Sequence, residues 1–229
     1  MQRRASIAAL GCLLACVAAP PTASPDRATA WGYVRLVPKA GLPAEEGGYS
    51  DRRLLGVQRF DYSHPAFAVV YAPGAPVRTA QTHELMLEAR ANGAHWSATV
   101  AAVGVNDRLR VANRTAIAQV VSAPALTWLR ELAPGEATEL APAAPGELLL
   151  HVLGGAGETA IVWVSPGAFA LANTAGRYEL DGLPPEVREL RAWHPRLPPS
   201  AGHTVRLEAG AATRVDLEIG VDRAAGAEP

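Results

Sequence analysis

The sequence predicts an all-β fold of the sandwich type. Short alternating or β-branched apolar runs are separated by Gly, Pro, Asn and Asp, as in strands joined by turns. No stretch combines a helical period with capping residues, so little helix is expected. Apolar residues make up 49% of the 229 residues and charged residues 19%, a balance typical of a chain with a packed core.

The expected strands follow one another from Tyr33 almost to the C-terminus, with one long polar interruption. Pro38 to Gly56 is polar and glycine-bearing, and we expect it to form a long mobile loop. In chain order the expected strands are Tyr33 to Val37, Phe67 to Tyr71, Glu84 to Arg90, Thr99 to Val103, Arg108 to Ala112, Ala118 to Val121, Leu148 to Val152, Thr159 to Val164, Arg177 to Leu180, Arg188 to Trp193, Thr204 to Glu208 and Thr213 to Ile219.

The N-terminal residues have the pattern of a secretion signal. A short positive start at Met1 to Arg4 precedes the apolar run Ala5 to Ala19, which is too short to span a bilayer. We therefore expect residues 1–30 to be a leader with a tether, and the protein to be exported. Both cysteines, Cys12 and Cys16, lie inside this run, so the folded part has no thiol or disulfide.

Two modes of processing remain open for this leader. Leu13-Leu14-Ala15-Cys16 resembles the lipobox of bacterial lipoproteins, in which the cysteine is lipidated and becomes the mature N-terminus. The alternative is cleavage by signal peptidase after the small residues Ala28-Thr29-Ala30. The first mode implies an outer-membrane lipoprotein and the second a free periplasmic protein.

A change of pattern near Ser165-Pro166-Gly167 indicates a boundary between two folded parts. Asn173-Thr174-Ala175-Gly176 is a turn sequence, and the aromatic strand after it predicts a hairpin. We expect one sandwich over residues 31–164, a smaller strand set over 165–222 and a disordered tail over 223–229.

Two segments resemble bacterial periplasmic cupredoxin-domain proteins of the methylamine-utilisation or plastocyanin-like kind. Asn113 to Ser122 is similar to the family's loop and strand around its first copper histidine, and Gly146 to Val164 aligns without gaps with the ligand loop and closing strand. Pro134-Gly135-Glu136 matches the family's turn. Gly176 to Leu190 and Trp193-His194-Pro195 are similar to the carboxypeptidase-regulatory-like end of the family. The resemblance implies a Greek-key cupredoxin-like β-sandwich followed by a smaller regulatory-like strand set.

The copper ligands that the resemblance implies are missing from this chain. The aligned positions of the two histidines, the cysteine and the methionine hold the residues Gln119, Gly155, Val152 and Glu158. A blue-copper site needs a thiolate and two imidazoles, and none of these four side chains supplies either group. We therefore expect a degenerate site with no metal or other cofactor.

Histidines outside the family pattern leave an alternative function open. His64, His83, His95, His151, His194 and His203 are scattered without metal-ligand spacing, so a structural role is the simplest interpretation. A folded cluster of His83, His95 and His151 is the alternative, and it predicts an atypical copper or zinc carrier.

Nothing in the chain has the pattern of an enzyme or of a nucleic-acid-binding protein. The chain contains no Gly-x-Ser-x-Gly or His-Glu-x-x-His motif, and Gly154 to Gly157 precedes a strand rather than a helix N-terminus. The net charge of -1 and the pI of about 6.6 provide no basic field for nucleic acid. We expect a non-catalytic binding module for an unknown protein or glycan of the cell envelope. Trp96 and Trp128 flank expected loops and are its candidate partner surface.

Overall fold

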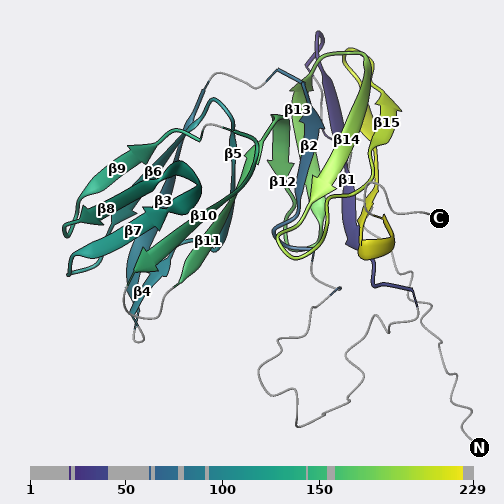
Figure 1. The fold of residues 1–229 in the computed structure, drawn as a ribbon. Coiled ribbons are helices and arrows are strands. Elements are labelled where there is room, and N and C mark those ends of the chain that lie inside the picture. Colours follow the sequence, from purple (N-terminus) through teal and green to yellow (C-terminus); the bar gives the residue numbers. More distant parts are fainter. Residues whose placement is uncertain are drawn as a thin grey trace, which may run out of the picture.

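The structure, a computed structural model, describes residues 21, 24–40, 62, 65–76, 80–90, 93–142, 144–153 and 158–223. The described chain is built from strands, with only two short 3-10 turns, η2 (Pro124–Leu126) and η3 (Val221–Arg223). It forms two β-sandwiches that lie side by side (Figure 1). The all-β sandwich prediction is therefore confirmed.

The central sandwich is made of the strands from β3 to β11. One sheet has the order β4-β3-β6-β9, and the facing sheet has the order β5-β11-β10-β7-β8. Strand β6 runs parallel to β3 and β11 runs parallel to β5, while the other neighbours are antiparallel. The strands are β3 (Thr82–Arg90), β4 (Gly93–Trp96), β5 (Val100–Gly104), β6 (Arg108–Asn113), β7 (Gln119–Ala123), β8 (Trp128–Leu132), β9 (Ala137–Leu140), β10 (Gly146–Leu153) and β11 (Thr159–Ser165).

The terminal sandwich combines strands from both ends of the chain. One sheet has the order β12-β2-β14-β15; in the other, β1 lies between β13 and the short strands β16 and β17. The strands are β1 (Ala28–Leu36), β2 (Val69–Pro73), β12 (Gly167–Leu171), β13 (Arg177–Leu183), β14 (Val187–Trp193), β15 (His203–Arg206), β16 (Ala212–Arg214) and β17 (Leu217–Ile219). The central sandwich is thus inserted between β2 and β12.

This pairing differs from the expected division at residues 31–164 and 165–222. Strand β1 pairs with β13, β16 and β17, and β2 pairs with β12 and β14, so the first two strands belong with the C-terminal set. The reason is burial: Val34, Val70 and Leu36 fill one core together with Leu180 and Leu190. Without β1 and β2, that apolar face would be open to water.

The expected end of the leader at residue 30 also needs correction. Strand β1 already begins at Ala28, and Ala28 and Ala30 are fully buried. The Thr29 hydroxyl donates a hydrogen bond to Asp181 Oδ1 at 2.8 Å. Cleavage after Ala30 would remove three paired residues of this strand. Most of the rest of the expected leader, including Cys16, and most of the expected loop from Pro38 to Gly56 lie outside the described residues.

The predicted hairpin at Asn173–Gly176 is a turn, but its strands do not pair with each other. Asn173 Oδ1 accepts from the N–H groups of Ala175 and Arg177, and Gly176 has φ of 80°. The strands on either side enter opposite sheets of the terminal sandwich. The turn therefore connects the two sheets as an arch. Tyr178 and Leu180, which follow it on β13, are buried in the core between the sheets.

An aromatic cluster joins the two sandwiches. Trp163 of β11 lies on the outer face of its sheet, whereas its neighbours Val162 and Val164 face the central core. Its ring stacks on Trp193 of β14 with centroids 4.7 Å apart. Tyr71 lies 5.4 Å from Trp163, and the Trp193 indole donates to Glu147 Oε1 at 3.0 Å. The outer face of the five-stranded sheet is thus apolar where the terminal sandwich covers it.

Candidate functional site

The first aligned copper position is part of a structural loop. Gln119 is buried at the start of β7, and its amide donates to the Thr115 hydroxyl at 3.2 Å. Asn113, also buried, donates to the carbonyls of Ile117 and Leu132 at 2.8 and 2.9 Å. Its Oδ1 accepts from both the N–H and the hydroxyl of Thr115. The hydrogen bonds of Asn113 therefore hold the loop before β7 in place, and Gln119 joins this network through Thr115.

The cysteine and methionine positions lie close together at the end of β10. The Val152 N–H donates to the Glu158 carbonyl at 3.1 Å, while the Val152 side chain is buried in the central core. Glu158 Oε1 contacts His95 Nδ1 at 2.5 Å, and Oε2 accepts from the Trp96 N–H at 2.8 Å. Burial raises the pKa of Glu158, but the bonds from His95 and Trp96 outweigh it, so its pKa lies below the ordinary value. Gly155 lies outside the described residues.

The side chains described at these positions do not fit a blue-copper ion. Gln119 and Glu158 are bonded to other protein groups, and Val152 offers no ligand atom. Among the described residues, one imidazole, that of His95, contacts an aligned position, whereas the site needs two with a thiolate. In the part of the chain that the structure describes, no three His, Cys, Asp or Glu side chains are grouped closely enough to share a metal ion.

The three histidines of the alternative metal site lie in different surroundings. His83 contacts Asp107, His95 contacts Glu158, and His151 bonds to the Thr159 hydroxyl at 2.9 Å. The structure therefore does not bring them together as one ligand set. Of the remaining histidines, His194 is buried in the terminal sandwich, His203 is exposed on β15, and His64 lies outside the described residues.

The expected partner surface at Trp96 and Trp128 also needs correction. Trp96 lies on β4 with 2% of its side chain exposed, because it packs in the central core beside Leu87 and Leu85. Trp128 is half-buried and packs against the same core. Neither indole forms an open platform for a partner.

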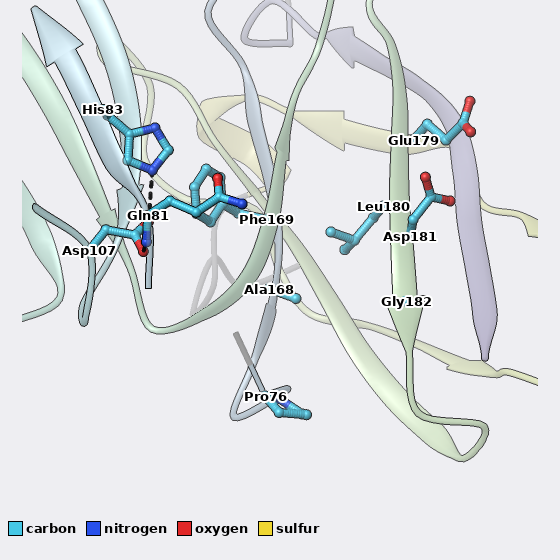
Figure 2. A pocket seen from close by; sticks show the side chains of 10 residues that line it. All are labelled: Pro76, Gln81, His83, Asp107, Ala168, Phe169, Glu179, Leu180, Asp181 and Gly182. Carbon is cyan, nitrogen blue, oxygen red and sulfur yellow. Dashed lines mark hydrogen bonds and ion pairs between the residues drawn. The ribbon is translucent and has the colours of Figure 1, made fainter. Parts of the chain in front are cut away.

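A cavity in the described part of the chain lies between the two sandwiches. Figure 2 shows His83 and Asp107 on one side, Phe169 of β12 at the centre and β13 on the other side. The cavity has a volume of about 240 Å³. Its polar and aromatic lining comprises Gln81, His83 and Asp107 from the central sandwich and Phe169, Glu179 and Asp181 from the terminal sandwich.

The partly exposed His83 and the buried Asp107 form a hydrogen-bonded pair at the wall of this cavity. His83 Nε2 lies 2.8 Å from Asp107 Oδ2, and Asp107 also accepts from the N–H groups of Gln81 and Gly104. Burial raises the pKa of Asp107, but these three donors outweigh it and hold the pKa below its usual value. An ionised carboxylate only accepts hydrogen bonds, so His83 carries its proton on Nε2 and keeps Nδ1 for another partner.

The cavity brings together residues that the sequence analysis did not select as one site. His83 was a metal candidate, whereas Phe169 and Glu179 had no assigned role. Asn106-Asp107 is a recognisable turn signal, but the three hydrogen bonds to Asp107 come from residues distant in sequence or across the turn. Only the packing of the two sandwiches places Phe169 6.4 Å from the His83 ring.

Comparison with known proteins adds no family to this geometry. No protein-family model matches the chain, and no curated protein is significantly similar to it. The cupredoxin-like resemblance therefore stays a prediction that depends on the motifs. Among the described helical turns, none has the length and apolar character to cross a membrane.

Proposed function

We propose that this chain is an exported, non-catalytic binding module of the cell envelope that binds its partner in the cavity between its two sandwiches. The observation that carries the proposal is the cavity itself, where His83, Gln81 and Phe169 meet the β13 strand. Binding sites commonly lie where two folded parts meet, with a few polar groups beside apolar ones. Here, neither sandwich forms the site alone.

The scaffold we propose is a cupredoxin-like sandwich inserted into a carboxypeptidase-regulatory-like one. The order of the central sheets supports it, because the chain changes sheet between β4 and β5, β5 and β6, β6 and β7, β8 and β9, and β9 and β10. Such crossing connections are typical of Greek-key sandwiches. The motif resemblance at Asn113 to Ser122 and at Gly176 to Leu190 supports the two family assignments.

A metal-free scaffold is supported by what fills the aligned ligand positions. Gln119 extends the hydrogen bonds of Asn113 and Thr115, and Glu158 anchors His95 and the Trp96 backbone. These interactions give the former ligand positions a structural use. The scaffold can then be retained for binding at its surface rather than for electron transfer.

The non-catalytic part of the proposal is supported by the composition of the cavity. His83 is held by Asp107 as a base would be, but the described residues that line the cavity include no serine, threonine or cysteine. Covalent catalysis usually requires a nucleophile that an adjacent base activates, and these lining residues supply no such nucleophile beside His83. His83 then acts as a hydrogen-bonding group for a ligand.

Export rests on the leader, and the proposed location is the periplasm or, through a lipid on Cys16, the outer membrane. Metabolic labelling with palmitate tests the anchor. Label that is incorporated by the natural chain and lost in Cys16→Ser indicates a lipoprotein. Release of a soluble, unlabelled protein into the periplasm indicates cleavage by signal peptidase.

Metal analysis separates the binding module from the alternative metal carrier. The purified protein is loaded with copper and zinc, desalted and measured by mass spectrometry together with its visible spectrum. We expect no stoichiometric metal. Retention of about one metal per chain, lost on combined substitution of His83, His95 and His151, would instead establish the carrier.

Ligand screening tests the cavity directly. Envelope glycans and peptides are screened by thermal shift, and hits are repeated with Phe169→Ala and with Ile117→Ala, an exposed control. A ligand that stabilises the natural chain and the control but not the cavity variant supports the proposal. Hits insensitive to Phe169→Ala contradict it.

A further inference from the structure

Strand β13 has an open edge where it meets the cavity. Among the described residues it pairs only with β1. Glu179 lies opposite Trp31, and the Trp31 carbonyl accepts from Val215 on the other side of β1 at 2.8 Å. In an antiparallel pair the backbone groups of such opposed residues point outward. The N–H and C=O of Glu179 therefore point away from β1, toward the cavity side.

A second edge strand lies beside the same space. Strand β12 pairs only with β2 in the described part of the chain, and the Ala172 N–H donates to the Ala68 carbonyl at 2.8 Å. Phe169 lies three residues before this bonded position, so its backbone groups point away from β2. Gln81 and His83 form the opposite wall. The cavity is thus bordered by backbone groups that are ready to pair with an extended chain.

The side chains of β13 alternate in character across its two faces. Leu180 points toward Phe169, while Glu179 and Asp181 point to the opposite face (Figure 2). Asp181 accepts the Thr29 hydroxyl, and Glu179 contacts Arg177 at 3.3 Å. A strand added to this edge would place every second side chain beside the two carboxylates and the others beside Leu180 and Phe169.

We propose that the cavity binds an extended peptide that adds a strand to the open edge of β13, with basic residues beside Glu179 and Asp181 and apolar residues beside Leu180. This inference rests on the proposed binding function and names the ligand class of that site. Main-chain hydrogen bonds supply affinity in strand addition, and the alternating side chains supply specificity. Charge complementarity with the two carboxylates selects a peptide over an uncharged glycan.

The test uses the full chain and a capped seven-residue probe, Thr-Arg-Val-Arg-Val-Arg-Thr, with a matched control peptide that carries Glu in place of Arg. Binding is measured by calorimetry. We expect the basic probe to bind and the acidic control to bind at least about tenfold more weakly. The double variant Glu179→Gln and Asp181→Asn should weaken the basic probe to a similar extent, while Glu139→Gln, an exposed acidic residue on β9, should leave it unchanged.

Backbone methylation of the probe distinguishes strand addition from simple charge attraction. An N-methyl group removes one main-chain donor, so methylation at alternate positions should abolish binding and at the positions between them should be tolerated. Equal effects at all positions would overturn strand pairing.

Two further outcomes separate this inference from the proposed function. A glycan that binds, and loses binding in Phe169→Ala, while no peptide binds, overturns the peptide inference and keeps the binding module. Failure of the probe, of a random displayed peptide library and of envelope glycans to bind overturns both. In that event the charged side chains of β13 serve only to prevent unwanted pairing of its open edge with other chains.

Discussion

The aromatic contact between the sandwiches should make them unfold as one unit. Trp193 is 1% exposed and stacks on Trp163 across the interface. Replacing a buried aromatic residue with alanine costs about 3–5 kcal/mol, which includes the loss of a stacked pair worth about 0.5–1.5 kcal/mol. Loss of the bond to Glu147 adds little, because this exposed carboxylate is hydrated in the variant. We therefore expect Trp193→Ala to lower the free energy of unfolding by about 3–5 kcal/mol.

The measurement is urea denaturation followed by far-UV circular dichroism and by hydrogen exchange. The natural chain should show one transition, and Trp193→Ala should show two, because the terminal sandwich loses an aromatic stack that joins it to the central one. Trp193→Phe keeps a six-membered aromatic ring for the stack but loses the five-membered part of the indole together with its N–H donor, so we expect a loss smaller than in Trp193→Ala, about 1–2 kcal/mol.

Leu171→Ala is the matched control, because this side chain is 44% exposed on the same sandwich. It should change the free energy of unfolding by less than about 0.5 kcal/mol. A loss below about 1 kcal/mol in Trp193→Ala, with a single transition retained, would refute the coupling through this interface.

Three further predictions concern stability. His194 is buried, and burial lowers its pKa from 6.5 to about 4, so the unfolded chain binds a proton first as the pH falls. Its contribution is complete above pH 6.5 and is lost toward pH 4, about 3 kcal/mol in all, which urea midpoints at several pH values measure. Asn113→Ala removes the side-chain donor to the buried Leu132 carbonyl and the acceptor of the Thr115 N–H and hydroxyl, and should cost about 2–3 kcal/mol by chemical denaturation. In Gly32→Ala the added Cβ overlaps the Val215 carbonyl, so the melting temperature should fall with a loss of about 1–3 kcal/mol.

Matched variants make these three predictions specific. His194→Asn should flatten the pH dependence between pH 6.5 and 4; an unchanged slope assigns that dependence to other groups. Arg114→Ala, an exposed neighbour in the same loop as Asn113, should leave stability within about 0.5 kcal/mol. Gly74→Ala is strained by its φ of 68° but has open space around it. A larger loss there than in Gly32→Ala would contradict the close-approach argument.

Several local features could be predicted from the sequence because neighbouring residues determine them. Period-two alternation identified β6, and short apolar or β-branched runs identified β10 and β11. The Asn173 and Gly176 turn follows from side-chain capping and a positive φ. Strands β4, β8, β9 and β12 were missed. They are short or lack clear alternation, as in Trp128–Leu132, and they form because neighbouring strands supply hydrogen bonds.

The four positions that the resemblance aligns with copper ligands could be named from the sequence, but the contacts of their side chains could not. The sequence shows that Gln119 and Glu158 are not blue-copper ligands. Only the folded chain shows that Glu158 contacts His95 and the Trp96 backbone. These two residues lie on β4, more than sixty residues earlier in the sequence. Likewise, only the folded chain shows that Trp96 is buried rather than available to a partner, because it packs in the central core beside Leu87.

The sequence by itself determined that the chain is all-β, where most strands run and which side chains cannot form a copper site. Alternation gives the two faces of a strand but not its neighbours, because pairing is made between residues distant in the chain. The tertiary structure therefore decided that β1 and β2 join the C-terminal strands, that the central sandwich is an insertion, and that His83 and Asp107 face the open edge of β13. The cavity is likewise decided by the tertiary structure, because it exists only where the two sandwiches pack together.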